Sequence, residues 1–321
     1  MNKYSILVLK ILKKIYSKYF AKKYIINEDI INTPNTASYL IYDALISAKP
    51  CMIARFGSTE LTCLLNYLGV NSFSKHYISY IKGNTPPWWW EEKIIQQMQN
   101  WSGFFPASVE KIQLFCELML NDINQIDILG SWLKDEIYFE KYLNHPIKVD
   151  LELLNPYFSD LSWTRALEGK KVLVIHPFDQ TIQSQYKKRD LLFNNNFLPE
   201  FELITIKAVQ SIAGNSTSFT DWFDALQFMK DEIDSIEFDI CLIGCGAYGL
   251  PLAAHVKRIG KIAFHLGGSL QLLFGIRGKR WENANYNSLY NYAALINEHW
   301  VKPSISDKPS NANIVEDACY W

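Results

Sequence analysis

Three glycines in the last third of the chain have the spacing of a phosphate-binding turn. Gly244, Gly246 and Gly249 match the pattern G-x-G-x-x-G and follow the apolar run at residues 238–243. Backbone N–H groups at such a turn, with the positive end of the next helix behind them, favour a phosphate over water. The spacing therefore predicts a nucleotide or diphosphate site at the carboxyl end of a parallel strand. The alternative is that the glycines only permit tight packing of the helix on the strand.

The region about twenty residues beyond the first glycine distinguishes two kinds of nucleotide. A dinucleotide site has an Asp or Glu there to hold the ribose hydroxyls, whereas this chain has Phe264, His265 and Leu266. A sugar nucleotide needs only a diphosphate cradle and one base pocket, so we expect it in preference to NAD or FAD. Tyr248 lies within the turn, where its ring would either stack on the nucleobase or pack on the helix.

Charged and polar side chains end three of the predicted strands. Arg55 lies near the end of a strand at 51–56, where a buried cation needs a diphosphate or carboxylate partner, the alternative being an ion pair with Glu60. His176 and His265 each end a strand. A neutral histidine there could take a proton from a sugar hydroxyl, and a protonated one could bind a phosphate. Because parallel strands end at one edge of a sheet, we expect these side chains to line one crevice.

Two further groups could take part in the same chemistry. Asp179, three residues after His176, is another candidate base. Lys279, Arg280 and Trp281 form a basic and aromatic cluster that would suit phosphate binding and ring stacking. The alternative for this cluster is a solvated basic turn.

The elements that must position these residues follow from the alternation of apolar runs and helical patterns. Strands are predicted at residues 51–56, 171–175, 203–209, 238–243 and 261–266, with helices between them and Gly130 in a short strand or turn at 130–133. This alternation predicts a Rossmann-like, mostly parallel sheet flanked by helices, with right-handed crossovers. We expect residues 33–321 to form one α/β domain, with a nucleotide-side half at about 169–282.

Residues of about 70–150 have a helical, aromatic-rich pattern and are predicted to be an insertion in that domain. Pro87 suits the first turn of a helix that would contain Trp88, Trp89 and Trp90. Neighbours on a helix point about 100° apart, so at least one of these rings would line a groove or interface.

The composition excludes some classes of protein. The chain has 321 residues, of which 49% are hydrophobic and 20% charged, with a net charge of −1. This balance is ordinary for a globular protein and argues against a dedicated nucleic-acid binder, which would be basic. The six cysteines form no C-x-x-C pair, and without an export signal we expect a reducing cytoplasm.

The first 26 residues carry seven lysines and no acid before Glu28. No apolar run in this segment is long enough for a transmembrane helix. Residues 1–32 are instead predicted to form a basic amphipathic helix. This helix could lie peripherally on an anionic membrane at the cytoplasmic face, or it could pack on the rest of the protein with its lysines in water. One helical stripe holds the apolar residues Leu7, Val8, Ile11, Leu12, Ile15, Tyr16 and Tyr19.

Two blocks together resemble a known family. Residues 53–61 (IARFGSTEL) resemble the Arg-Phe-Gly-Asp-x-Glu block of bacterial GT-D-type glycosyltransferases, and residues 238–268 resemble their nucleotide-side block. The likeness covers about residues 48–281 and extends to uncharacterised relatives found with surface-polysaccharide genes. It implies a GT-D-like fold and a transferase that uses a nucleoside-diphosphate sugar, a saccharide or lipid-linked saccharide acceptor, and Mn²⁺ or Mg²⁺ bound through a D-x-E motif.

The chain departs from the family pattern at the motif aspartate, which is Ser58 here, while the glutamate is kept as Glu60. One carboxylate and one hydroxyl hold Mg²⁺ or Mn²⁺ more weakly than two carboxylates. Either the metal is held mainly by the diphosphate and Glu60, or the enzyme is metal-independent. In the second case Arg55, Lys279 or Arg280 would neutralise the leaving group.

We therefore expect a hexosyltransferase-like enzyme of surface-polysaccharide or glycan synthesis. Two alternatives stay open: an NAD-linked oxidoreductase that uses the glycine turn, and a non-catalytic nucleotide-sugar-binding subunit. A second D-x-E, Asp150 to Glu152, lies in a predicted connector and is interpreted as coincidence. Candidate bases are Glu60, Asp179 and His265, and candidate substrate contacts are Arg55, Gly57, Ser58, His176, Gly244, Gly246, Tyr248, Gly249, Gly267 and Lys279.

Overall fold

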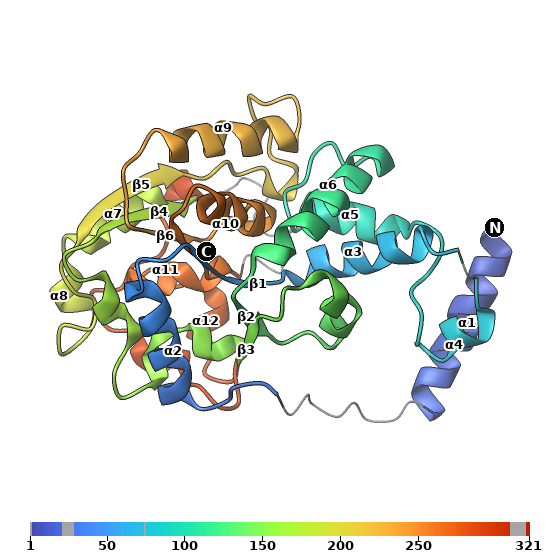
Figure 1. Cartoon of the computed structure of the whole chain (residues 1–321), viewed down its shortest axis with the longest axis horizontal. Helices are drawn as coiled ribbons and strands as arrows, with labels where there is room; N and C mark the ends of the chain where they lie inside the picture. Colours follow the sequence, from blue (N-terminus) through green and yellow to red (C-terminus); the bar gives the residue numbers. More distant parts are fainter. Residues whose placement is uncertain (1, 21–28, 74, 309–318) are drawn as a thin grey trace.

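One parallel sheet organises the part of the chain that the computed structural model describes, residues 2–20, 29–73, 75–308 and 319–321. Its seven strands have the order β3-β2-β1-β7-β6-β4-β5, and all the described pairs are parallel (Figure 1). The predicted Rossmann-like α/β architecture is confirmed. The strands are β1 (Cys51–Arg55), β2 (Ile128–Ser131), β3 (Ile147–Asp150), β4 (Lys171–His176), β5 (Glu202–Lys207), β6 (Ile240–Ile243) and β7 (Ile262–His265).

Helices cover both faces of this sheet (Figure 1). Most of the longer helices lie between consecutive strands in the sequence, as the sequence pattern predicts. The helices are α1 (Lys3–Tyr19), α2 (Pro34–Ile46), α3 (Ser58–Val70), α4 (Tyr77–Ile81), α5 (Glu92–Asn100), α6 (Val109–Asp122), α7 (Asp179–Tyr186), α8 (Arg189–Leu192), α9 (Trp222–Asp234), α10 (Gly249–Arg258), α11 (Leu270–Leu273) and α12 (Lys279–Glu282).

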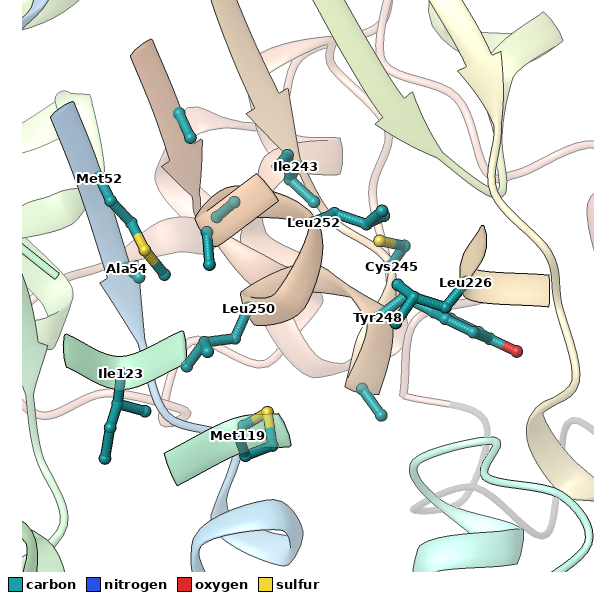
Figure 2. Packing of buried hydrophobic residues seen from close by; sticks show 14 of the residues in the cluster. Met52, Ala54, Met119, Ile123, Leu226, Ile243, Cys245, Tyr248, Leu250 and Leu252 are labelled. Atoms are coloured by element: carbon teal, nitrogen blue, oxygen red, sulfur yellow. The ribbon is translucent and has the colours of Figure 1, made fainter. Parts of the chain in front are cut away.

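The central strands are buried on both faces, and alternate residues enter two separate cores. Met52 and Ala54 of β1 belong to a core cluster with residues of helices α3, α6, α9 and α10, part of which is shown in Figure 2. Ile53 points the other way and packs with α2, α7 and the segment around Trp163. Successive side chains of a strand point to opposite faces, so an uninterrupted apolar run supplies both cores. The result is a three-layer molecule whose strand ends are left free to form a site.

The stretch at 70–150 differs from its prediction. It contains α4, α5 and α6 but also β2 and β3, which extend the sheet beyond β1. Strand β2 includes residues 130 and 131 of the strand or turn predicted at 130–133 and begins two residues earlier, whereas β3 was not predicted. In β3 only Val149 is buried and Ile147 is exposed. An edge strand of this kind lacks the apolar run that marks a central strand. Asp150 therefore ends a strand and does not lie in a connector.

The three consecutive tryptophans precede helix α5, so the predicted helix at Pro87 is wrong. The rings of Trp88 and Trp89 contact each other edge to face, with centroids 5.2 Å apart, and both contact Tyr80 of α4. Trp90 packs on Tyr67 of α3, with centroids 6.4 Å apart. These half-buried rings join α3 to α4.

Helix α1 begins with an N-cap, in which the Ser5 N–H donates to Asn2 Oδ1 at 2.8 Å. It contacts α4, far from the sheet (Figure 1). The predicted helical segment at 1–32 is thus helical over 3–19, while residues 21–28 lie outside the described part. Among the described helices, none combines the length and the apolar character needed to cross a membrane.

Candidate functional site

A cavity of about 420 Å³ opens at the carboxyl ends of the central strands. Its lining includes Arg55 from the end of β1, His176 from β4, Gly244 after β6 and His265 from β7. These strands are consecutive neighbours in the sheet, and the carboxyl edge of a parallel sheet is where ligands bind in this class of fold. Residues from four distant parts of the sequence therefore meet in one place.

The three glycines of the glycine turn (residues 244–249) have two different roles, cavity lining and close packing. Gly244 and Gly246 line the cavity. A Cβ on Gly244 would lie 2.6 Å from the carbonyl oxygen of Gly267, and Gly246 has a φ of +58° that favours glycine. Gly249 is not in the lining, and a Cβ there would lie 2.2 Å from Nε2 of His265. Gly246 is exposed and leaves its backbone accessible to a ligand, whereas Gly244, whose N–H donates to the Ile175 carbonyl at 2.9 Å, and Gly249 permit close packing.

Both cavity histidines are held neutral by burial. Each is 3% exposed, and burial lowers the pKa of His176 to about 3. Burial also lowers the pKa of His265 to about 3, helped by the Arg55 charge and opposed by a hydrogen bond with the Arg55 backbone. The Phe178 N–H donates to Nδ1 of His176 at 3.0 Å, so the proton of that ring is on Nε2. Burial therefore favours the neutral form of both rings near neutral pH.

Arg55 and Glu60 lie at the junction of β1 and α3. Glu60, in the first turn of α3, is 8% exposed, and a Cβ on Gly57 would lie 1.7 Å from its Oε2. Only glycine at position 57 leaves room for the carboxylate in this position. The Arg55 guanidinium lies 5.3 Å from the centre of the Trp132 ring. Burial lowers the pKa of Arg55, while nearby Tyr320 and Glu60 raise it.

A second arginine reaches the cavity from the other end of the chain. The Arg280 guanidinium lies 4.9 Å from the centre of the Tyr320 ring and donates to the Tyr320 hydroxyl at 3.4 Å. A Cβ on Gly268 would lie 2.2 Å from this ring, which shows how closely it packs. Trp321 is buried beside it and donates from Nε1 to the Asp307 carbonyl at 3.3 Å. Tyr320 and Trp321 thus form a wall of the cavity, and their position does not follow from the strand pattern.

The ring of Tyr248 is buried against helix α9. It is 2% exposed and lies parallel to Trp222 of α9, with centroids 4.9 Å apart and planes 9° apart. Its hydroxyl lies 3.2 Å from Oγ of Ser211. Tyr248 borders the cavity, but its ring is packed on α9 within the core, so of the two alternatives packing agrees with the structure, and the helix it packs on is α9. The more open rings of the lining are those of Trp101, Trp132 and Tyr286.

Two other predicted residues are not in the lining. Asp179 begins α7 one residue after Phe178, the last lining residue of that loop. Lys279 precedes Arg280 in α12, and neighbours on a helix point about 100° apart, so the cavity receives the arginine. The predicted residues Gly57, Ser58, His176 and Gly267 do line it.

The cavity offers one carboxylate to a divalent metal ion, and Glu152 lines the smaller adjoining chamber. Glu60 is the only carboxylate among the described lining residues, and Arg55 lies near it. No cluster of three or more His, Cys, Asp or Glu suited to a metal occurs in the described ranges. Mg²⁺ takes oxygen ligands in octahedral geometry and is commonly held by one or two carboxylates together with substrate phosphates and water. Ser58, at the position of the motif aspartate, lines the same cavity as Glu60.

The chain was compared with known proteins. No family model matches it, and no curated protein does so. Two solved structures align over most of its length. One is a selenomethionine-substituted structure of domain of unknown function 1792, with a TM-score of 0.33, 14% identity, and 93% of this chain and 96% of that chain covered. The other is described as domain of unknown function 1792 with a distinct glycosyltransferase fold, with a TM-score of 0.34, 13% identity, and coverage of 94% and 96%.

Proposed function

We propose that this protein is a glycosyltransferase that moves a sugar from a nucleoside-diphosphate donor to a saccharide acceptor. The observation that supports it best is that the glycine turn, Arg55 and Glu60 border one cavity. The turn presents the exposed backbone of Gly246 to a diphosphate, Arg55 offers a cation, and Glu60 offers a carboxylate. These are the groups needed to stabilise an anionic leaving group and to activate a hydroxyl nucleophile.

The size and rim of the cavity agree with such a ligand. Its volume of about 420 Å³ lies within the usual range for small-molecule sites. Trp101 and Trp132 are partly exposed at its border, and aromatic faces of this kind stack on bases and sugar rings.

In the proposed mechanism Glu60 takes the proton of the acceptor hydroxyl. The hydroxyl oxygen then attacks the anomeric carbon of the donor, and the bond between that carbon and the diphosphate oxygen breaks. Its electron pair leaves with the diphosphate, whose charge is stabilised by the glycine turn, Arg55 and Arg280. His265, with its lowered pKa, is a hydrogen-bond partner in this scheme and a poor base.

The two arginines would supply the positive charge that a metal ion supplies in other transferases. Arg55 and Arg280 both border the cavity and a smaller adjoining chamber of about 70 Å³, so a diphosphate between them would contact both. A guanidinium stays charged at all relevant pH values and can hold phosphate oxygens in pairs. We propose metal-independent transfer on this basis.

The acceptor would be a saccharide or lipid-linked saccharide of surface-polysaccharide or glycan synthesis. A lipid-linked acceptor would place the reaction at the cytoplasmic face of a membrane. A non-catalytic nucleotide-sugar-binding protein is the second candidate, because Ser58 replaces the motif aspartate.

A binding screen followed by a turnover assay tests the proposal. UDP-, GDP-, CMP- and dTDP-sugars are added to the protein, and a specific donor should raise its melting temperature by mass action. Slow hydrolysis of that donor should fall by about 100-fold or more in Glu60→Gln, while the donor-induced shift is kept. The exposed carboxylate Glu168, changed to Gln, is the matched control.

Each result has a clear meaning. A shift with NAD(H) and with none of the sugar nucleotides would support the oxidoreductase and overturn the transferase. Donor binding without hydrolysis or transfer by the unmodified protein would instead support the non-catalytic subunit.

A further inference from the structure

One face of helix α1 packs against the rest of the protein. Leu9 is its only buried residue among those described, and the helix contacts α4. The Lys13 ammonium lies 4.5 Å from the centre of the Tyr80 ring of α4, and Lys10 forms an ion pair with Glu91 at 2.5 Å. These contacts fix the rotation of α1 about its own axis.

The opposite face of α1 carries an apolar stripe that no described residue buries. Its members recur with the i, i+3, i+4 pattern of an amphipathic helix, which puts them on one side of α1, away from Leu9. Each side chain is between 42% and 82% exposed. A helix stripe of this kind normally faces a core, so its exposure marks an interaction surface. The stripe consists of Tyr4, Leu7, Val8, Ile11, Leu12, Ile15 and Tyr19.

Lysines identify the kind of partner. Lys3, Lys14 and Lys18 are exposed, and helical spacing places all three along one flank of the stripe. The 17 residues of α1 include no acidic residue to balance them. An apolar stripe bordered by cations complements a surface that is apolar below and anionic above, which is the interface of a bilayer containing anionic lipid. Ile78 of α4 is 70% exposed and adds an apolar group on the helix that contacts α1.

We infer that α1 docks this protein on an anionic membrane surface. The helix lies in the plane of the interface, with the stripe at the boundary of head groups and acyl chains and the flanking lysines at the level of the lipid phosphates. The contact face with α4 stays formed, so the helix links the membrane to the body of the protein. The inference does not depend on the proposed chemistry, although it would bring a lipid-linked acceptor within reach.

Sedimentation of the full chain with vesicles tests this docking. We expect binding to phosphatidylcholine vesicles that contain about a quarter phosphatidylglycerol, and at least about tenfold weaker binding to pure phosphatidylcholine. Salt at about 0.5 M should weaken the anionic binding as well, because it screens the lysines.

Two variants separate the apolar and the charged contributions. Ile11→Gln with Ile15→Gln keeps the charge and should reduce binding at least about tenfold. Lys14→Gln with Lys18→Gln should remove most of the preference for anionic lipid. Leu289→Glu, at an exposed apolar residue far along the chain, is the control and should bind as the unmodified protein does. Unchanged melting temperatures would show that all variants remain folded.

Three outcomes would overturn the inference. The first is no sedimentation with anionic vesicles, and the second is equal binding to neutral and anionic vesicles. The third is a concentration-dependent dimer that Ile11→Gln with Ile15→Gln abolishes in the absence of vesicle binding, which would show that the stripe pairs with a second copy. Because no readout is enzymatic, failure here and failure of the proposed transferase are distinguishable.

Discussion

At the scale of single residues, burial decides which groups of the cavity can carry charge. His176 and His265 are nearly inaccessible to water, and the pKa of each is lowered to about 3 by that burial. Arg55 keeps its charge in spite of burial because a guanidinium has a very high reference pKa. The cavity at neutral pH therefore combines a fixed cation with two neutral rings, and Glu60 is the group best placed to accept a proton.

The buried histidines predict how stability depends on pH. In the unfolded chain a histidine has a pKa of about 6.5, so the unfolded state binds more protons than the native state at lower pH. The stability from keeping the rings neutral is present above about pH 6.5 and is lost as pH falls toward 3. We expect a loss of up to about 1.4 kcal/mol per pH unit for each ring between about pH 6 and pH 4.

Urea unfolding between pH 7.5 and pH 4.5 measures this slope. His176→Asn should make the dependence clearly flatter, whatever it does to stability at pH 7.5. The exposed His76, changed to Asn, should leave the slope as it is. Equal slopes for the unmodified protein and His176→Asn would show that the ring is not held neutral.

At the scale of elements, the junction of β1 and α3 places two site residues at once. The strand ends in Arg55, Gly57 is the N-cap of α3, and Glu60 lies in the first helical turn. A carboxylate near a helix N-terminus is stabilised by the helix dipole. Because the Glu60 carboxylate lies against Gly57, any larger residue at position 57 would displace it.

Gly57→Ala tests this displacement. The φ of Gly57 is −73°, so alanine adds no backbone strain, but its Cβ would overlap Oε2 of Glu60. We expect the carboxylate to move and donor turnover to fall by about tenfold or more, with little change in melting temperature. Thr62→Ala, at an exposed position of α3 outside the cavity lining, is the matched control. Full activity in Gly57→Ala would mean that the position of Glu60 does not matter.

At the scale of the whole molecule, two arginines that are far apart in the sequence border one cavity. Arg55 comes from the first strand, and Arg280 comes from α12, where residues 319–321 pack against it. If the pair replaces a metal, excess EDTA should change the rate of transfer or donor hydrolysis by less than about twofold, and added Mn²⁺ should not raise it further.

The same assay with Arg280→Gln would distinguish a direct role of the arginine from metal chemistry. We expect a rate loss that Mn²⁺ does not restore, because the cation is part of the protein. Loss of activity in EDTA, with recovery on adding Mn²⁺, would contradict the metal-independent mechanism and point to a metal carried with the donor.

Much of the site could be predicted from local patterns. A strand that ends in Arg55, His176 or His265 places its last side chain at the carboxyl edge of the sheet, whatever the strand order. The edge strand β3 could not be predicted in this way because Val149 alone carries its buried face. The sequence pattern also could not predict where a side chain points outside the regular helices and strands. Tyr248, which stacks on Trp222, is an example.

The sequence by itself determined the parallel α/β architecture and the group of strand-end residues, because both follow from periodicity along the chain. It also determined the basic, amphipathic character of α1. Only the tertiary structure decided that the apolar stripe of α1 faces outward, that Arg280 and Tyr320 close the cavity, and that the two histidines are neutral. Exposure and protonation depend on which distant segments pack around a residue, and local sequence does not record those contacts.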